Sequence, residues 1–249
     1  MCTLAILRRP GHDWPVVIGA NRDEMIDRPW QPPARHWPDR PEVVAGLDEL
    51  AGGSWLGIND WGVAAAVLNR TGSLGPAPGR RSRGELVLEA LDHADAVAAA
   101  RALADLDPDA YRTFNLIVAD ERDAFWLRHA GDGNIEVRPL KEGLSMIAAG
   151  DLDDLTTRRL ELALPAFREW PPPEPDRDDW VAWQELLGST RVPPGEPAAA
   201  AMRFRTDGYG TVSSALIALP ARSEPDRHAR FRFAGWHPQT VPWQDVNLA

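Results

Sequence analysis

The chain has 249 residues, of which 44% are hydrophobic and 26% are charged, and its formal net charge is −10. This length allows one large domain or two small ones and is ample for a buried core. The acidic balance, without a basic patch, argues against a nucleic-acid partner. The single cysteine excludes an internal disulfide framework and fits a reducing compartment.

The apolar segments are too short for a membrane role. No stretch approaches the roughly 20 apolar residues that a membrane-spanning helix needs. The apolar run near the N-terminus ends at Arg8, so it is shorter than the hydrophobic region of a signal peptide. The sequence therefore predicts a cytoplasmic protein without a transmembrane segment.

Two short strands are predicted at the start of the chain. Residues 2–7 and 15–20 are almost continuously apolar, which is typical of strands buried on both faces. Residues 28–41 are rich in proline, which removes backbone donors and fixes φ, so an ordered loop or an extended cover is expected there. Trp30 and Trp37 in this segment are expected to be lid or packing residues.

The middle of the chain changes from strand to helix periodicity. Residues 62–69 are mostly small and apolar and follow a predicted turn at residues 59–60, which indicates a strand that permits close backbone approach. The sequence SRGE at residues 82–85 resembles a capping box at the start of a helix. An alanine-rich stretch predicts a second helix over residues 95–106.

Strands and helices continue in blocks through the rest of the chain. Two helices are predicted, over residues 153–169 and from the pair Asp178-Asp179 to about Leu187. The order of strands, two helices, strands, two helices and strands implies two sheets stacked face to face with helix pairs outside, in one domain over residues 1–249. The strands of these later blocks are predicted at 113–119, 124–129, 135–139, 144–149, 209–219 and 230–235.

The chemistry of the N-terminus centres on Cys2. If Met1 is removed, Cys2 carries a thiol and an α-amine on the same residue. The amine has a reference pKa of about 7.7–8.0, so it is partly neutral at pH 7 and can take the proton of a thiol whose own pKa is near 8.5. Arg22 can stabilise the thiolate, Asp23 can orient the amine, and Asn69 carries an amide donor suited to an oxyanion hole.

The same residues have simpler explanations. Most free cysteines are small buried hydrophobic residues, and this description fits Cys2 as well. Arg22, Asp23 and Glu24 can equally form a solvated strand end or a structural ion pair, and Asn69 can be a turn residue. The residue types alone leave both interpretations open.

A series of short motifs extends along the chain. In order, these are Met-Cys at the start, Asn21-Arg22-Asp23-Glu24 with Arg28-Pro29, Ala45-Gly46, the run GGSWLG at 52–57, Leu68-Asn69, Ser82-Arg83-Gly84, Phe114-Asn115-Leu116 with Asp120, and Ser213-Ser214. Together they resemble the NRDE family, also called the transport-and-Golgi-organisation-2-like family. The resemblance covers essentially the whole chain. It implies an N-terminal-nucleophile hydrolase-like α+β fold, a four-layer αββα sandwich of two mainly antiparallel sheets.

The front end is also distantly similar to the choloylglycine hydrolases and penicillin V acylases, which cleave amides with an N-terminal cysteine. This similarity implies that Cys2 is the nucleophile, that Arg22 and Asp23 are its charged neighbours, and that Asn69 contributes to the oxyanion hole. The charged residues are spaced differently here, as Asn-Arg-Asp and not as Arg-Asn-x-Asp.

Three positions depart from the residues usual in relatives. Ala149 stands where a second oxyanion-hole asparagine is expected, and Val212 and Leu47 stand where many relatives have arginine. An oxyanion-hole donor is worth about 2.7–4 kcal/mol of transition-state stabilisation. The substitution at Ala149 therefore weakens the case for efficient amide hydrolysis.

Two functional hypotheses follow. The first is a hydrolase with Cys2 as nucleophile, acting without cofactor or metal on the C–N bond of a small-molecule amide. Asn21, Trp55 and Trp30 are its expected substrate contacts. The second is a non-catalytic binding or trafficking protein on the same scaffold, for which the family resemblance implies a haem-like or lipid-like ligand. In that case Cys2 or one of the six histidines, such as His36, is a candidate axial ligand of haem.

Overall fold

The computed structural model describes residues 2–223, 226–237 and 240–249 and contains two stacked β-sheets. Neighbouring strands in both sheets pair antiparallel. The six-stranded sheet has the order β10 (Gly143–Ile147), β1 (Thr3–Arg8), β2 (Val16–Met25), β11 (Tyr209–Leu219), β12 (Arg230–Gly235), β13 (Val241–Asp245). The seven-stranded sheet has the order β3 (Trp30–Ala34), β4 (Val43–Asp48), β5 (Leu56–Asn59), β6 (Ala64–Asn69), β7 (Phe114–Ala119), β8 (Ala124–His129), β9 (Glu136–Pro139).

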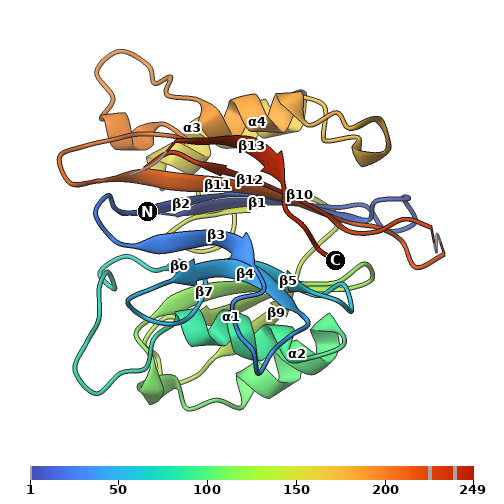
Figure 1. Cartoon of the computed structure of the whole chain (residues 1–249). Helices are drawn as coiled ribbons and strands as arrows, with labels where there is room; N and C mark the ends of the chain where they lie inside the picture. The colour runs from blue at the N-terminus through green and yellow to red at the C-terminus, as the bar shows by residue number, and fades with distance from the viewer. Residues whose placement is uncertain (1, 224–225, 238–239) are drawn as a thin grey trace.

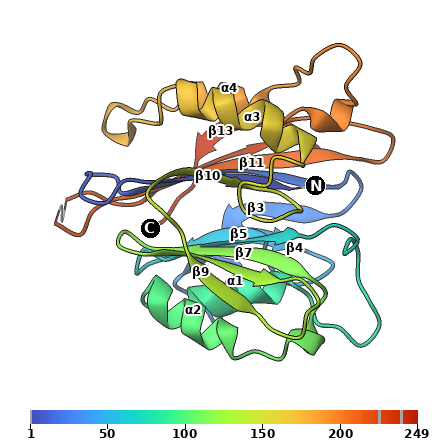
Figure 2. The same ribbon diagram turned by 180° about the vertical axis from the view of Figure 1, so that it is seen from behind.

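Two pairs of helices cover the outer faces of the sheets (Figure 1). Helices α1 (Gly84–Leu91) and α2 (Ala96–Ala104) lie on the seven-stranded sheet, and α3 (Arg158–Glu169) and α4 (Val181–Gly188) lie on the six-stranded sheet, as the reverse view in Figure 2 also shows. The predicted α+β fold of four αββα layers is confirmed. Short 3-10 turns occur at Pro108–Ala110, Pro175–Arg177 and Ala198–Ala200.

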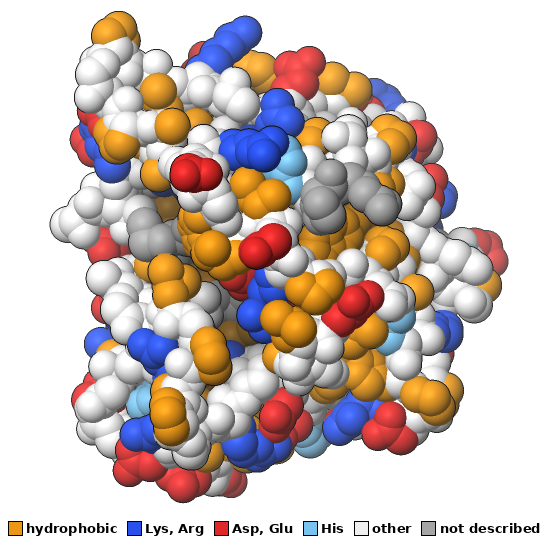
Figure 3. Space-filling model, turned by 60° about the vertical axis from the view of Figure 1, so that its left-hand side comes forward, with side chains coloured by type: hydrophobic (Ala, Val, Ile, Leu, Met, Phe, Trp, Pro, Cys, Tyr) orange, Lys and Arg blue, Asp and Glu red, His pale blue; other side chains and the backbone are white. Residues whose placement is uncertain are grey.

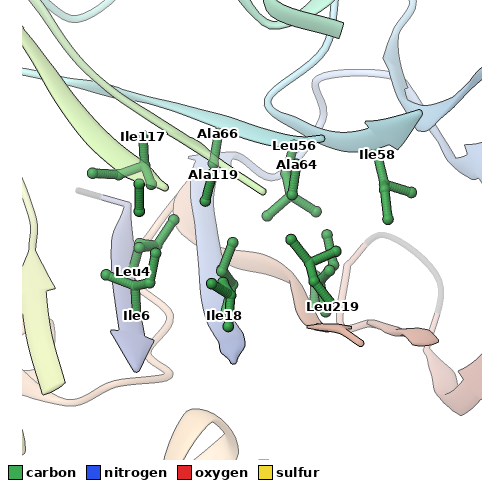
Figure 4. Close-up of a cluster of buried hydrophobic side chains, with 14 of the residues drawn as sticks. Leu4, Ile6, Ile18, Leu56, Ile58, Ala64, Ala66, Ile117, Ala119 and Leu219 are labelled. Atoms are coloured by element: carbon green, nitrogen blue, oxygen red, sulfur yellow. The ribbon is translucent and has the colours of Figure 1, made fainter. Parts of the chain in front are cut away.

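The main hydrophobic core lies between the two sheets. Side chains of β1, β2 and β11 point toward those of β5, β6 and β7, as Figure 4 shows for Leu4, Ile18 and Leu219 opposite Leu56 and Ile117. Alternate residues of the same strands pack against the helices and form two outer clusters. This period of two is the intrinsic geometry of a strand, so neighbours along the sequence face different layers.

Several predicted element boundaries are corrected by the structure. Strand β2 does not stop near residue 20 but continues through the polar residues to Met25, because β11 pairs with it along its whole length. The proline-rich cover contains the short edge strand β3, where missing backbone donors are tolerated. Strands β4 and β13 were not predicted, and α3 begins only at Arg158, after turns that include a left-handed Asp153.

The predicted capping box at residues 82–85 is wrong. Helix α1 has Arg83 at its N-cap position without a side-chain capping bond, and the Ser82 hydroxyl oxygen accepts from the Gly84 N–H at 3.2 Å. The second predicted helix, α2, does have a side-chain N-cap. The Asp95 carboxylate accepts from the N–H of Ala98 at 2.7 Å. Among the described residues, no helix combines the length and apolar character that crossing a bilayer requires.

Candidate functional site

Cys2 immediately precedes β1 and lies beside the polar end of β2. The antiparallel register pairs Thr3 with Asn21, which brings the thiol next to the backbone of Asp23. The Asp23 N–H lies 3.4 Å from the Cys2 Sγ, and the Sγ lies 3.6 Å from the Asp23 carbonyl oxygen. Pairing of these two consecutive strands therefore places Cys2 and the Asn21–Glu24 segment at one site.

The thiol borders a small cavity of about 20 Å³ between the two sheets. This volume is close to that of one water molecule, for which about 10–15 Å³ is the minimum. Figure 3 shows this end of the molecule, where hydrophobic and basic side chains border a hollow in the surface. The residues that line the cavity are Cys2, Thr3, Leu4, Ala20, Asn21, Arg22, Trp55, Leu56, Ala66, Val67, Leu68, Ser213 and Ala215.

A second cavity of about 1010 Å³ lies elsewhere in the molecule. Its walls include Ile58 at the far end of β5, Leu219 at the end of β11 and Phe231 near the start of β12. These strand ends are opposite to those that surround Cys2, because β2 runs from Val16 beside Leu219 to Asp23 beside Thr211. The larger cavity is therefore separate from the cysteine site.

Arg22 is the charged side chain of the cysteine cavity. Its side chain is only 4% exposed, and its Nη2 donates to Asp48 Oδ2 at 2.8 Å. Arg28 binds the same carboxylate through two hydrogen bonds of 2.7 and 2.9 Å. Burial lowers the pKa of Arg22, against the opposing effect of Glu24 and Asp48. Its Nη1 is buried and makes no hydrogen bond within the described part of the chain, so a donor remains available for a ligand.

Trp55 forms the aromatic wall of this cavity. The guanidinium carbon of Arg22 lies 4.2 Å from the centre of the indole ring, which is a cation–π contact. Trp30 packs edge-on against Trp55 with ring centroids 6.1 Å apart. A Cβ atom on Gly46 would lie 2.4 Å from the Trp55 ring, so only glycine permits this position of the indole. Of the two tryptophans expected as substrate contacts, Trp55 lines the cavity and Trp30 supports it from behind.

The Asp23 side chain lies on the other face of β2. Its Oδ2 accepts from Arg159 Nη1 at 2.6 Å, and its Oδ1 accepts from the Thr211 hydroxyl at 2.8 Å. The same Arg159 nitrogen donates to Thr3 Oγ1 at 2.9 Å, which ties α3 to the start of β1. Arg22 and Asp23 are adjacent in sequence, but their side chains lie on opposite faces of the sheet.

Arg159 was not predicted from the sequence. It is 3% exposed and belongs to the face of α3 that also carries Leu160, Ala163 and Phe167. A charged residue on the apolar face of an amphipathic helix is the signal that could have found it, because a buried guanidinium needs a partner. The partner itself could not be named, since Asp23 lies 136 positions earlier in the chain.

In the chain that retains Met1, the surroundings of Cys2 favour the protonated thiol. Burial raises the pKa of the thiol, and the negative charge of Asp23 acts in the same direction. Arg22 opposes this shift but does not cancel it. The pKa of Tyr209, whose hydroxyl donates to the Asp23 carbonyl at 3.3 Å, is also raised, by burial and by the negative charge of Asp23. Attack by Cys2 therefore requires a base.

Asn21 has a structural set of contacts. Its amide nitrogen donates to the carbonyls of Leu187 and Met202 at 2.9 and 2.8 Å, and its amide oxygen accepts from the Ser214 hydroxyl. These bonds connect β2 to α4, to the segment before β11 and to β11 itself. Although Asn21 contributes to the cavity wall, both ends of its amide are engaged on the helix side. Its role as a substrate contact stays a prediction.

Asn69 and the other expected ligand groups lie away from the cavity. Along β6, Ala66 and Leu68 face the opposite sheet and Val67 packs toward the helices, and Asn69 follows in the helix-facing series. Asn69 is not among the cavity-lining residues, so its oxyanion role stays a prediction. The ring of His36 bonds the Pro32 carbonyl at 2.8 Å in the exposed cover. Among the described residues, no group of three or more His, Cys, Asp and Glu is placed to hold a metal ion.

Several solved structures share this fold. The chain aligns over 98% of its length with 86% of penicillin V acylase from Agrobacterium tumefaciens, at 16% identity and a TM-score of 0.63. It aligns over 97% of its length with all of the Caenorhabditis elegans ortholog of N-acylethanolamine-hydrolyzing acid amidase, at 14% identity and a TM-score of 0.61. A conjugated bile acid hydrolase from Clostridium perfringens aligns at 11% identity with a TM-score of 0.53. At these identities the likeness shows a shared fold.

Sequence relatives identify the family. The Transport and Golgi organization 2 homologs of Mus musculus and Bos taurus are 36% and 38% identical to this chain over 111 residues. The match spans 42% of this chain and only 38% of the length of either relative. The family model described as Transport and Golgi organisation 2 matches residues 1–170, which is more than half of the chain. The chain therefore belongs to the Transport and Golgi organisation 2 family.

Proposed function

We propose that this protein is a hydrolase of small-molecule amides, with Cys2 as the nucleophile after removal of Met1. The observation that carries the proposal is the cavity that Cys2 shares with Arg22. It holds a nucleophile and a buried cationic donor whose Nη1 makes no hydrogen bond within the described residues. A buried donor of this kind is expected where negative charge develops during a reaction.

The reaction follows the general course of acyl transfer to a thiol. The free α-amine of mature Cys2 takes the thiol proton, directly or through one water, and the sulfur attacks the amide carbon. The C–N bond of the tetrahedral intermediate breaks, and the amine leaves with the proton. Water then attacks the thioester and releases the carboxylic acid and the thiol. Met1 lies outside the described residues, so its removal is part of the proposal.

Arg22 is assigned the electrostatic role in this scheme. Its buried guanidinium stabilises the thiolate and then the oxyanion, both of which are negative. Asp48 and Arg28 keep it in place, since Nη2 is engaged by Asp48 while Nη1 is left for the reacting group. While Met1 is in place, burial raises the pKa of the Cys2 thiol, and the negative charge of Asp23 acts in the same direction. The α-amine that is freed when Met1 is removed is assigned the role of general base during the attack.

The comparisons support this proposal at the level of the scaffold. The solved structures with this fold include an acylase, an acid amidase and a bile acid hydrolase, and the chain covers 86–100% of each of the first two. No observation of similar strength supports the alternative of a haem-like or lipid-like ligand at Cys2.

The test compares two forms of the same protein. One form begins with Cys2, produced by a protease that leaves no extra residue, and the other retains Met1. Each is incubated with an amide-directed acylating probe, and intact mass and peptide mapping locate the adduct. We expect an adduct on Cys2 in the mature form and at least about tenfold slower labelling when Met1 is retained. Cys2→Ala is the control that removes the nucleophile. Equal labelling of mature protein and Cys2→Ala would contradict the proposal.

A further inference from the structure

On the basis of the proposed function, we infer that a polar clamp between the two sheets, made by Arg70, Asn115 and Asp151, positions Cys2 for attack by fixing the sheets against each other. The clamp joins the segment that follows β10 to the ends of β6 and β7. Its three members are positioning residues, because none of them lines the cavity beside the sulfur.

The segment that follows β10 lies next to the start of β1. In the six-stranded sheet β10 pairs with β1, and the antiparallel register places Ile147 opposite Leu4. Residues 148–150 therefore leave the sheet beside Cys2. Ala149, at the position where a second oxyanion-hole asparagine is expected, is part of this segment. An alanine side chain has no polar group, so hydrogen bonds can hold this position only through its backbone.

Three consecutive carbonyl groups of this segment accept hydrogen bonds from the side of the seven-stranded sheet. The amide nitrogen of Asn115 donates to the carbonyls of Ala148 and Gly150 at 3.0 and 2.8 Å. The backbone N–H of Thr71, just after β6, donates to the carbonyl of Ala149 at 3.1 Å. Successive carbonyls of a regular strand alternate in direction, so this shared direction ends β10 and ties its end to the other sheet.

Arg70 and Asp151 complete the clamp. Arg70 directly follows β6, and its Nη1 donates to the Asn115 amide oxygen at 2.7 Å while its Nη2 donates to Asp151 at 2.6 Å. The indole N–H of Trp126 donates to the same amide oxygen at 3.1 Å. Asn115 is fully buried, and both ends of its amide have two partners, so its orientation is fixed. These contacts join only residues between 70 and 151, so removal of Met1 takes none of them away.

Cys2 lies between two polar links that join the sheets. On one side of β1, Arg22 of β2 donates to Asp48 of β4 in the opposite sheet at 2.8 Å. On the other side, the clamp joins residues 148–151 to β6 and β7. The cavity beside the thiol takes walls from both sheets, including Leu68 near the end of β6. A shift between the sheets would therefore move Cys2 relative to a substrate held against the opposite wall, and a misplacement of about 1 Å can cost about 10²-fold in rate.

The experiment compares two reactions of Cys2 in mature protein. In acylation by p-nitrophenyl acetate, sulfur attacks the ester carbonyl, the C–O bond breaks, p-nitrophenolate leaves with the bonding electrons, and the thiol proton passes to the α-amine. In alkylation by iodoacetamide, a C–S bond forms, iodide leaves, and the thiol proton passes to the buffer. Alkylation reports the exposure and ionisation of the thiol, whereas acylation also needs a positioned carbonyl. The ratio of the two rates in wild type should exceed that of cysteine methyl ester at least about tenfold.

Variants of the clamp should lower this ratio. Arg70→Met removes the guanidinium, and Asn115→Asp places an oxygen against two carbonyls, so each should reduce the ratio at least about tenfold. Arg70→Lys keeps the charge and should recover part of the loss. Arg81→Met is the matched control, since Arg81 is 48% exposed and pairs with two glutamates of α1; it should stay within about twofold of wild type. Circular dichroism verifies folding. Asp151→Asn, at a side chain that is 45% exposed, should also lower the ratio and replaces any clamp variant that does not fold.

The outcomes separate this inference from the proposed function. If Cys2 is acylated but the folded clamp variants keep the wild-type ratio within about threefold, the positioning role is overturned and the nucleophile stands. An equal fall in acylation and alkylation would also overturn it, because the clamp would then act on the thiol itself. A wild-type ratio no greater than that of cysteine methyl ester would overturn it as well. If mature protein is not acylated at Cys2, the proposed function fails and the inference fails with it.

Discussion

Replacing Arg159 by methionine tests the contact that joins α3 to the site. The change keeps most of the side-chain volume but removes the guanidinium that donates to Asp23 at 2.6 Å and to Thr3 at 2.9 Å. The Arg159 and Asp23 side chains are 3% and 0% exposed. Breaking a buried ion pair by removing one partner costs about 3–5 kcal/mol. For a chain of this size each kcal/mol lowers Tm by about 2–4 °C, so we expect a decrease of about 6–20 °C.

Urea denaturation followed by circular dichroism measures this effect. The matched control is Arg158→Met, because Arg158 is the adjacent arginine on α3, is 42% exposed and pairs with Glu161 and Glu196. An exposed ion pair contributes about 0–1 kcal/mol, so this control should remain close to wild type.

The double variant Arg159→Met/Asp23→Asn completes a mutant cycle. It removes the carboxylate charge together with the guanidinium. Its loss in free energy of unfolding should therefore be at least about 1 kcal/mol smaller than the sum of the losses in the two single variants. Equal free energies of unfolding for Arg159→Met and Arg158→Met would refute the reasoning. Strict additivity in the cycle would show that the two side chains are not energetically coupled.

Four further predictions concern the neighbourhood of Cys2. Because burial raises the pKa of the Cys2 thiol, protein that retains Met1 should react with iodoacetamide more slowly than free cysteine at pH 8, and the midpoint of its rate against pH should lie above that of free cysteine; a midpoint at or below that of free cysteine would contradict this. The folded thiol keeps its proton to higher pH than the unfolded thiol, so stability should decrease as pH rises through the unfolded pKa, and Cys2→Ala should remove that part of the decrease. Gly46→Ala should cost about 1–3 kcal/mol in urea unfolding, since its Cβ would lie 2.4 Å from Trp55, whereas Gly188→Ala meets no atom within 4 Å and should be nearly neutral. Asn21→Leu should cost about 2–4 kcal/mol, because two buried carbonyls and the Ser214 hydroxyl lose their partner; a loss below 1 kcal/mol would argue that these bonds are dispensable.

The layer order was predictable because it depends on local periodicity. Apolar runs at the start of the chain indicated buried strands, and the change to helical spacing near residue 84 marked the first helix pair. The block order of strands and helices then allowed few architectures. Strands β3, β4 and β13 were harder to recognise. The edge strands β3 and β13 contain proline, and the position of each strand depends on pairing with a neighbouring strand.

The sequence by itself determined the position of the cysteine and the composition of the segment that meets it. Cys2 precedes an apolar strand, and the next strand ends in Asn21, Arg22, Asp23 and Glu24, so a short hairpin suffices to bring them together. This is a local consequence of antiparallel pairing, and the resemblance to a known family pointed to the same residues.

Only the tertiary structure decided which layer of the fold each of those side chains enters. Strand alternation directs Arg22 to the cavity between the sheets and Asp23 to the helix layer. There Asp23 pairs with Arg159, which lies 136 positions away in the sequence. The size of the cavity depends on where the Trp55 ring rests, and that depends on Gly46 in a neighbouring strand. Such features arise from packing between distant segments, for which a single sequence carries no periodic signal.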